Sequence, residues 1–360
     1  MNLRNPRRIL IIRRDNIGDL ICTTPLFRAL RETFPHAYIA ALVNSYNAPV
    51  LAGNEAVDRV FVYTKAKHAS SPVDAVKALA ARLGLYWNMR REKFDVAIAA
   101  GSCAAPRAVR LARLAGAKTV VGYDDPNARG PRPDALLAAT DAHGRHEVEN
   151  VYALAASLGV SMPIPKMEIF PDEDMRRQIC HRLGDTGAQC PSGQMTIGVH
   201  ISARKPTQRW PEERFVQLLR EITASPYVRV LLFWAPGDES NAQHPGDNQK
   251  AERILSAISN AAVHPCPTNR LEELIAGLSL CDYVICSDGG AMHIAAALGK
   301  PIVCLFGQSD ATRWYPWGVP HTILQPASRD VKDVTVNEVV SAYRQLISPL
   351  GGVSESRFVR

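Results

Sequence analysis

Ser287-Asp288-Gly289-Gly290-Ala291-Met292-His293 lies between two strand-like apolar runs. It follows a strand-like run, Asp282 to Cys286, and opens a helix of small residues that stops at Gly299-Lys300-Pro301. A second apolar run, Ile302 to Gly307, comes directly afterwards. A strand, a glycine turn and a helix start in this order predict an anion site, because free backbone N–H groups and the helix dipole point at one place.

This turn suits a nucleotide-sugar. The glycines let a phosphate approach the backbone closely. Asp288 follows the strand directly, where a carboxylate can accept hydrogen bonds from sugar hydroxyls. The alternative is that Asp288 only caps the helix, and this segment alone leaves both interpretations open.

The rest of the chain alternates strand-like and helix-like segments. The sequence predicts strands at residues 8–13, 38–43, 57–63, 94–99, 119–122, 195–201 and 228–234. It predicts helices at 24–33, 73–91, 106–115, 147–158, 211–219, 249–260, 271–278 and 335–347, with loops at 14–23 and 124–141. This alternation implies an α/β fold of parallel, doubly wound sheets in two Rossmann-like halves. Pro- and Gly-rich segments at 161–171 and 184–193 predict the linker between the halves.

Length and composition fit two ordinary domains. The chain has 360 residues, 46% hydrophobic and 21% charged, which argues against disorder. We find no apolar run of the roughly 20 residues that cross a bilayer, and Ile9 to Ile12 is too short for a signal-peptide core. The expected location is the cytoplasm. The eight cysteines form no C-x-x-C pair, so we expect free thiols and no zinc site.

The net charge of +7 is concentrated in the first half, where residues 1–160 hold 22 Lys and Arg against 14 Asp and Glu. The start is densest, with Arg4, Arg7, Arg8, Arg13 and Arg14. Such a face suits anionic lipid or a phosphorylated acceptor, although solubility explains the excess equally well. Nucleic acid is not expected as a partner, since no nucleic-acid-binding motif is present.

Asp15-Asn16-Ile17-Gly18-Asp19 follows the first predicted strand. Ligands of open α/β sheets bind at the carboxyl ends of strands. Gly18 allows a tight turn, and Asp19 can remove a proton from an acceptor hydroxyl. The alternative is a turn held by its own Asp side chains. The G-x-G-x-x-G fingerprint of dinucleotide sites is absent.

Three further segments carry candidate site residues. The loop from His200 to Pro211 supplies a hydroxyl and cations that can hold a departing diphosphate, namely Ser202, Lys205 and Arg209, or it is an exposed basic loop. Asp238 follows another strand and can bind a ribose diol, or belongs to a plain turn. Asp172-Glu173-Asp174 looks like a metal-binding D-x-D, but its place at a helix start favours capping, so no metal site is expected.

These motifs, in this order, resemble glycosyltransferase family 9, the bacterial heptosyltransferases of lipopolysaccharide core synthesis. The resemblance covers nearly the whole chain and rests on ILIIRRDNIGDLICTTPLFRALRETFP, HISARKPTQRWPEERF and CSDGGAMHIAAALGKPIVCLFGQSDATRW. It implies the GT-B fold, two Rossmann-like doubly wound domains facing across a cleft that holds the active site. It also implies inverting transfer of a sugar, a heptose from ADP-heptose, without metal or other cofactor. The acceptor would be a lipopolysaccharide core or related glycan, met at the cytoplasmic face of the inner membrane.

The resemblance also implies domain roles and residue roles. Residues 1–165 would bind the acceptor, 166–193 would link the domains, 194–335 would bind the nucleotide-sugar, and 336–360 would form a C-terminal helix and tail. Asp19 matches the general base, with Asp15, Asn16 and Gly18 beside it on the acceptor side. The donor residues would be Ser202, Lys205, Arg209, Asp238, Asp288, Gly289, Gly290 and His293.

Two departures from the family pattern leave the heptose and the nucleotide open. Asp15-Asn16 stands where two small hydroxyl residues are common, and Gln208 stands where many members carry lysine. Arg209 or Lys205 is the candidate replacement for that charge. The alternatives are a family member using another nucleotide-sugar for capsule, O-antigen or glycoprotein assembly, a dinucleotide-dependent oxidoreductase, and a non-catalytic sugar-nucleotide or lipid-binding module.

Overall fold

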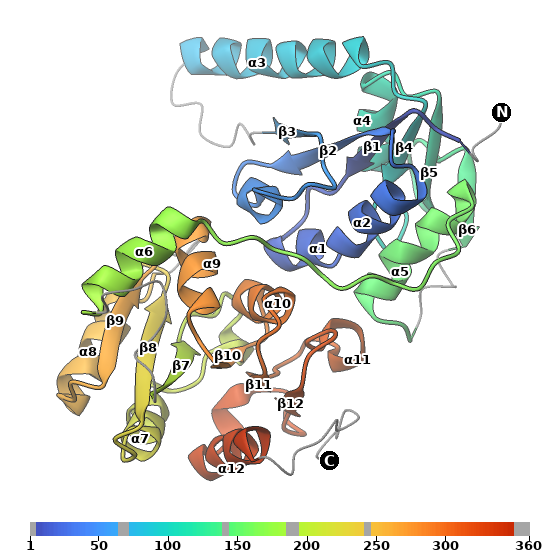
Figure 1. Cartoon of the computed structure of the whole chain (residues 1–360). Helices are drawn as coiled ribbons and strands as arrows, with labels where there is room; N and C mark the ends of the chain where they lie inside the picture. The colour runs from blue at the N-terminus through green and yellow to red at the C-terminus, as the bar shows by residue number, and fades with distance from the viewer. Residues whose placement is uncertain (1–4, 64–71, 139–143, 185–193, 241–245, 349–360) are drawn as a thin grey trace. The chain divides into compact units, whose positions relative to one another are not determined.

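The computed structural model describes residues 5–63, 72–138, 144–184, 194–240 and 246–348. The chain divides into two compact units, Met1–Ile169 and Phe170–Arg360, each built on its own parallel sheet. Figure 1 shows both units, each a sheet with helices on its two faces. The predicted α/β fold with two Rossmann-like sheets is therefore confirmed.

The first unit contains a six-stranded sheet in the order β3-β2-β1-β4-β5-β6. Its strands are β1 (Arg8–Ile12), β2 (Tyr38–Asn44), β3 (Arg59–Tyr63), β4 (Val96–Ala99), β5 (Thr119–Asp124) and β6 (Ala135–Ala138). Its helices are α1 (Ile17–Ile21), α2 (Thr24–Thr33), η1 (Ala48–Leu51), α3 (Pro72–Arg91), α4 (Pro106–Leu114), α5 (Glu147–Ala153) and η3 (Leu154–Leu158). In Figure 1, α3 and α4 lie on one face of the sheet and α1, α2 and α5 on the other.

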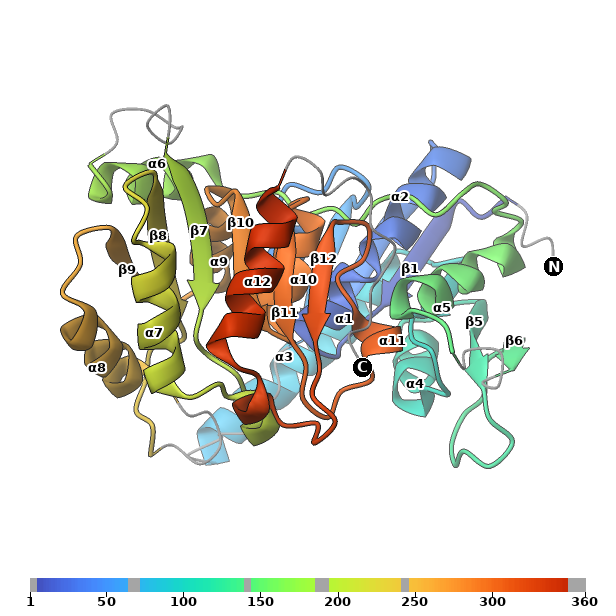
Figure 2. The ribbon, with the colours of Figure 1, turned by 90° about the horizontal axis from the view of Figure 1, so that it is seen from below.

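The second unit repeats this plan in the order β12-β11-β10-β7-β8-β9. Its strands are β7 (Met195–His200), β8 (Val228–Trp234), β9 (Val263–Pro267), β10 (Tyr283–Ser287), β11 (Ile302–Leu305) and β12 (His321–Leu324). Its helices are α6 (Glu173–Arg182), η4 (Pro206–Gln208), α7 (Glu212–Ile222), α8 (Asn248–Ile258), α9 (Leu271–Ser279), α10 (Gly290–Ala297), α11 (Ala311–Trp314), η5 (Val331–Asp333) and α12 (Val336–Ile347). Figure 2 shows α7 and α12 together on one face of this sheet.

Central strands form because their residues are apolar on both faces. Ile9 to Ile12 of β1 are at most 1% exposed, and the pairing of Leu10 with Ala40 on one side and Ala97 on the other fixes the register. In the second unit β7 and β10 have the same role, with Ile197 and Ile285 fully buried. Such continuous apolar runs are typical of parallel strands that are covered by helices on both sides.

Four sequence predictions were wrong or incomplete. Residues 14–23 contain the short helix α1, and the predicted loop 124–141 contains β6. Strands β9 and β12 were not predicted. β6, β9 and β12 all lie at sheet edges, where one side is unpaired and the apolar signal weakens.

Two helix starts were predicted correctly from their caps. The Asp172 side chain accepts a hydrogen bond from Met175 N at 2.9 Å, so the acidic run caps α6. Thr335 and Glu338 form the expected capping box of α12. No helix in the described part of the chain is long and apolar enough to cross a membrane.

Candidate functional site

The second sheet brings two predicted motifs to one edge. β7 and β10 are neighbours, with His200 paired to Cys286, although β8 and β9 lie on the other side of β7. Strand order therefore reverses between β7 and β10, and ligands of such sheets bind outside the carboxyl ends at this point. The loop carrying Ser202 leaves β7 here, and the turn carrying Asp288 leaves β10 beside it.

The Asp288 turn has the geometry expected of an anion site. Gly289 adopts φ +157°, a conformation that side chains disfavour, and a Cβ placed on it would meet no heavy atom within 4 Å. α10 begins at the next residue, and the N–H groups of its first turn have no partner within the helix. Asp288 is half-buried, and its backbone N donates to Leu305 O at 2.9 Å.

A neutral side chain holds the Asp288 carboxylate. Gln208 Nε2 donates to Asp288 Oδ2 at 2.5 Å and to Ser309 Oγ at 3.0 Å. Lys205 Nζ donates to the same hydroxyl at 3.1 Å. Gln208, Ser309 and Lys205 therefore connect the loop after β7 to the loop after β11, beside the turn after β10.

A glycine makes this approach of the two loops feasible. A Cβ on Gly307 would lie 2.4 Å from Thr207 O, which a real side chain cannot do. Ser309 was not among the predicted site residues. The signal available was that Gly307-Gln308-Ser309 follows β11 just as Asp288-Gly289 follows β10.

A buried lysine holds both ends of the loop after β7. Lys250 of α8 is 9% exposed, and its Nζ donates to Ile201 O at 3.0 Å and to Trp210 O at 3.2 Å. Burial lowers the pKa of Lys250, against the attraction of Asp247 and Glu212. Lys250 was not among the predicted site residues, because no local pattern in the sequence links it to residues 201–210.

Two other residues that were predicted to bind the nucleotide-sugar form hydrogen bonds with the backbone of nearby loops. Ser202 Oγ accepts a hydrogen bond from Ala235 N at 2.8 Å. The exposed Arg209 donates to Ala203 O at 3.0 Å and to Arg204 O at 3.1 Å, so its guanidinium is tied to its own loop.

Asp238 and His293 lie in different settings. The Asp238 carboxylate accepts from Ser240 N at 2.7 Å in the turn after β8, and this hydrogen bond lowers its pKa. His293 is 3% exposed within α10, with its ring edge-to-face with Trp314 at 5.9 Å between centroids. Gly290 is the first residue of α10.

In the first unit Asp19 lies in a buried network of charges. Arg13 Nη2 is 2.6 Å from Asp19 Oδ1 and 2.7 Å from Glu147 Oε1, and Arg13 Nη1 donates to Ala100 O at 2.8 Å. Arg13, Asp19 and Glu147 are 2%, 9% and 1% exposed. The backbone N and side-chain Nδ2 of Asn16 donate to Asp19 Oδ2 at 2.8 and 2.9 Å. Glu147 was not among the predicted site residues, since it lies 134 residues from Arg13 in the sequence.

This network decides the protonation of Asp19. Burial disfavours its carboxylate, but the charge of Arg13 and the hydrogen bonds from Asn16 outweigh burial, and the pKa of Asp19 is lowered. Two carboxylates likewise keep Arg13 charged against burial. The predicted basic surface of the first unit therefore does not include Arg13, because Arg13 is buried inside the unit.

The neighbouring residues that were predicted to contact the glycan acceptor lie in a loop that is held by hydrogen bonds. Asp15 O accepts from Asn44 Nδ2 at 3.5 Å and from Asn47 Nδ2 at 3.4 Å, while Asn16 is the N-cap of α1 and Gly18 is buried within it. The Asp15 carboxylate lies 3.4 Å from Arg13 Nε, with 61% of its side chain exposed. Partial burial raises the pKa of Asp15 in spite of Arg13, and the Asp19 carboxylate adds to the rise.

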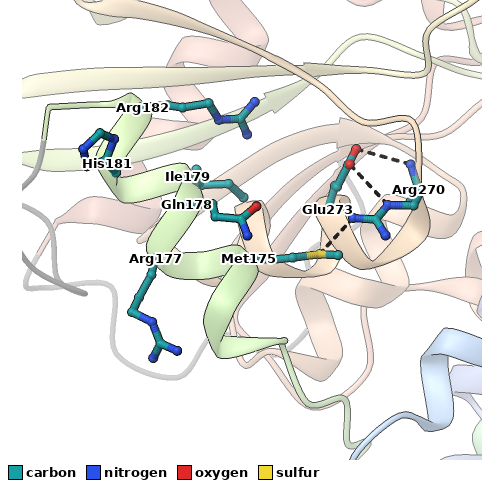
Figure 3. A pocket seen from close by; sticks show the side chains of 8 residues that line it. All are labelled: Met175, Arg177, Gln178, Ile179, His181, Arg182, Arg270 and Glu273. Atoms are coloured by element: carbon teal, nitrogen blue, oxygen red, sulfur yellow. Dashed lines mark hydrogen bonds and ion pairs between the residues drawn. The ribbon is translucent and has the colours of Figure 1, made fainter.

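A separate pocket of about 600 Å³ lies between α6 and α9 of the second unit (Figure 3). Its lining includes Met175 and Glu273, both of which contact Arg270, at 4.0 Å from the Met175 sulfur and 3.4 Å from Glu273. None of the predicted site residues lines it. Within the described residues, no group of three or more His, Cys, Asp or Glu side chains is placed to hold a metal ion.

Comparison with known proteins identifies the family. Residues 82–342 match the model of glycosyltransferase family 9 (heptosyltransferase). Lipopolysaccharide heptosyltransferase 2 of Salmonella typhimurium is 24% identical over 318 residues, covering 84% of this chain and 83% of that protein. Lipopolysaccharide heptosyltransferase 1 of Escherichia coli is also 24% identical, over 92% of this chain and 95% of that protein.

Solved structures agree on the fold. A family 9 glycosyl transferase from Veillonella parvula superimposes with a TM-score of 0.78 at 20% identity, over 94% of this chain and 97% of that one. An Escherichia coli heptosyltransferase with ADP gives 0.75 at 20% identity, over 94% and 99%. The architecture is thus the GT-B fold of these neighbours. The chain is a glycosyltransferase and belongs to glycosyltransferase family 9.

Proposed function

We propose that this chain is an inverting, metal-independent glycosyltransferase that moves a heptose from ADP-heptose onto a lipopolysaccharide core or related surface-glycan acceptor. The observation that carries the proposal is the Asp288 carboxylate at an open glycine turn, beside Gln208 and at the start of α10. Curated relatives named lipopolysaccharide heptosyltransferases support the reaction. A neighbour described with ADP and another with ADP-2-deoxy-2-fluoro heptose support the donor.

On the donor side, the diphosphate lies against Gly289, Gly290 and the N-terminus of α10, with Ser202, Lys205 and Arg209 supplying a hydroxyl and positive charge. Asp288 accepts hydrogen bonds from the sugar, Asp238 from the ribose, and His293 supports the α10 turn. Asp288→Ala should therefore weaken nucleotide-sugar binding about tenfold or more, as expected for a lost hydrogen bond to a charged group. Unchanged donor affinity in calorimetry would return Asp288 to a capping role.

On the acceptor side, residues 1–165 bind the glycan, and Asp15, Asn16 and Gly18 position its hydroxyl. Asp19 takes the hydroxyl proton as the oxygen attacks the anomeric carbon from the face opposite the diphosphate. The bond from that carbon to the diphosphate oxygen breaks, and the nucleoside diphosphate leaves with the electron pair. Lys205, Arg209 and the helix dipole stabilise its charge.

The electrostatics make Asp19 an ionised base over a wide pH range, because its lowered pKa keeps it unprotonated. The same lowering weakens it as a proton acceptor, whereas the raised pKa of Asp15 makes that carboxylate the more basic of the two. Asp15 is therefore the second candidate for the base. Its exposed side chain is the observation in its favour, whereas the nearby Arg13 guanidinium counts against it.

Paired variants test the base. Asp19→Asn should lower turnover about a hundredfold or more while donor affinity is largely kept. Asp15→Asn is the matched control, expected to change turnover by less than about tenfold. Near-normal turnover of Asp19→Asn together with an inactive Asp15→Asn would assign the base to Asp15. The assay is release of nucleoside diphosphate with donor and acceptor present.

A second candidate is transfer from a different nucleotide-sugar, for capsule, O-antigen or glycoprotein assembly. One observation favours it: the residue in the place of the family lysine is the neutral Gln208, buried and held between Asp288 and Ser309. A different cation position implies a different diphosphate or sugar geometry. Turnover with UDP- or GDP-sugars and none with ADP-heptose would favour this candidate.

A further inference from the structure

Helix α3 carries apolar side chains on two of its faces. Its inner face carries Leu85, Tyr86 and Met89, which pack against the core cluster of the first sheet. Its outer face carries Val76, Leu79, Leu83 and Trp87, which are 67%, 57%, 59% and 66% exposed. The spacing of three, four and four residues places these four side chains in one line along the helix.

This line, which we call the α3 ridge (Val76, Leu79, Leu83 and Trp87), differs from the other exposed apolar residues. Tyr46, Leu136 and Tyr227, for example, are exposed singly, which is ordinary on protein surfaces. In the described part of the first unit, Figure 1 shows no element on the outer side of α3. A continuous ridge of large apolar side chains needs a partner that removes it from water.

Charge indicates what kind of partner this is. Lys77 lies beside the ridge and is exposed, and Arg90 and Arg91 follow its last residue and are exposed. Arg90 Nη1 reaches Leu114 O of α4 at 3.4 Å, and α4 adds the exposed Arg107 and Arg110. The sequence of α3 contains four cations and one acidic residue, Asp74 in its first turn. The ridge is therefore bordered by positive charge.

We propose that α3 docks on a bilayer that contains acidic phospholipids, with the α3 ridge inserted among the headgroups and Lys77, Arg90 and Arg91 on the phosphates. Tryptophan is enriched at membrane interfaces, where one end of its ring is apolar and the other is wet, and cations beside such a group are attracted to acidic lipid headgroups. The ridge spans about 16 Å along one helix. A specific protein interface needs about 800 Å² from each partner, more than one row of four side chains supplies.

The experiment is vesicle co-sedimentation of the full chain, without donor or acceptor, on phosphatidylcholine vesicles with and without phosphatidylglycerol. We expect binding to the acidic vesicles that falls with added salt. The triple variant Leu79→Gln, Leu83→Gln, Trp87→Gln should bind at least about tenfold more weakly, as should Arg90→Gln with Arg91→Gln. The matched control is Tyr227→Gln, which removes an equally exposed apolar residue from the second unit and should bind as wild type does.

Trp87 gives a test that does not depend on the folding of a triple variant. Brominated acidic lipids should quench part of the tryptophan fluorescence of the wild type, and Trp87→Phe should abolish that part. Absence of binding to acidic vesicles, or equal binding by the triple variant, would overturn the proposal. A concentration-dependent dimer of the wild type in ultracentrifugation that the triple variant lacks would also overturn it, by assigning the ridge to a second copy.

Membrane docking by α3 does not depend on the proposed reaction, and separate experiments can disprove each proposal. Vesicle binding needs no donor, and sugar transfer to a detergent-free, truncated acceptor needs no bilayer. The triple variant should therefore keep wild-type turnover on such an acceptor while it loses vesicle binding. Loss of both in a folded protein would contradict the assignment of the ridge to docking alone.

Discussion

The two carboxylates at the centre of the proposed reaction, Asp19 and Asp288, are held in opposite ways. Asp19 is buried and paired with an arginine that also binds Glu147. Asp288 is half-buried and receives its hydrogen bond from the neutral amide of Gln208. The first arrangement fixes a charge and its position, and the second leaves a carboxylate beside open space at a helix start. The difference suits a base that must stay ionised and a group that must exchange protein contacts for sugar hydroxyls.

The largest effect is expected when the charge network is broken. Arg13→Met leaves Asp19 and Glu147 buried without a counter-charge and should lower the free energy of unfolding by about 3–5 kcal/mol. The matched change at the other site, Gln208→Met, removes a neutral donor from the Asp288 carboxylate and should lower the free energy of unfolding by about 1.5–2 kcal/mol. Urea unfolding of both variants measures this contrast. Equal losses would mean that the two carboxylates are held alike.

Lys250 offers an intermediate effect on the donor side alone. Lys250→Met removes the ammonium that holds Ile201 O and Trp210 O, and thereby loosens the loop that carries Ser202, Lys205 and Gln208. We expect nucleotide affinity to fall about tenfold, a loss of about 1.4 kcal/mol, with the Asp19 network unaffected. Lys300→Met is the control, since Lys300 also donates to a carbonyl, Ser279 O at 2.9 Å, away from this loop. Unchanged nucleotide affinity in calorimetry would show that the loop holds its form without Lys250.

These contrasts also mark what the sequence can predict. The sequence predicts that Asp288, Gly289 and Ser202 share one site because they lie just after strongly apolar strands, and strand ends in a parallel sheet meet at one edge. Glu147, Ser309 and Lys250 were missed, because they meet their partners across 134, 101 and 49 residues. Contacts between such distant segments follow from packing and leave no local pattern.

The same reasoning explains the missed strands. β1 was predicted because Ile9 to Ile12 form an uninterrupted apolar run, which matches their burial on both faces of the sheet. β9 contains Pro265 and Pro267, and β6 exposes Leu136 at 52%, so neither has the apolar alternation of a covered strand. Both lie at sheet edges, where proline and exposed side chains are tolerated.

The smallest effect concerns acid stability. Burial, together with the charge of Lys250, lowers the pKa of His200 to about 4. The unfolded chain binds a proton at His200 below about pH 6.5, whereas the folded chain does so only near pH 4, so stability should fall as pH drops through this window. Asp19, with a lowered pKa, contributes stability that is lost only below its unfolded value of 3.8. His200→Gln should remove about 1 kcal/mol of the fall in the free energy of unfolding between pH 6.5 and 5. Urea unfolding at a series of pH values measures this. If the free energy of unfolding changed with pH in the variant as it does in the wild type, His200 would not be held in its neutral form.

A calorimetric titration of the wild-type chain with ADP, UDP, GDP, CDP and NAD tests whether the Asp288 turn binds the donor nucleotide. We expect ADP to bind at least about tenfold more tightly than the other nucleotides. The variant Asp288→Ala should bind ADP nearly as well as the wild type but lose affinity for ADP-heptose. Tightest binding of UDP or GDP would contradict the heptose assignment. Tightest binding of NAD, or no binding of any nucleoside diphosphate, would contradict the proposed donor site itself.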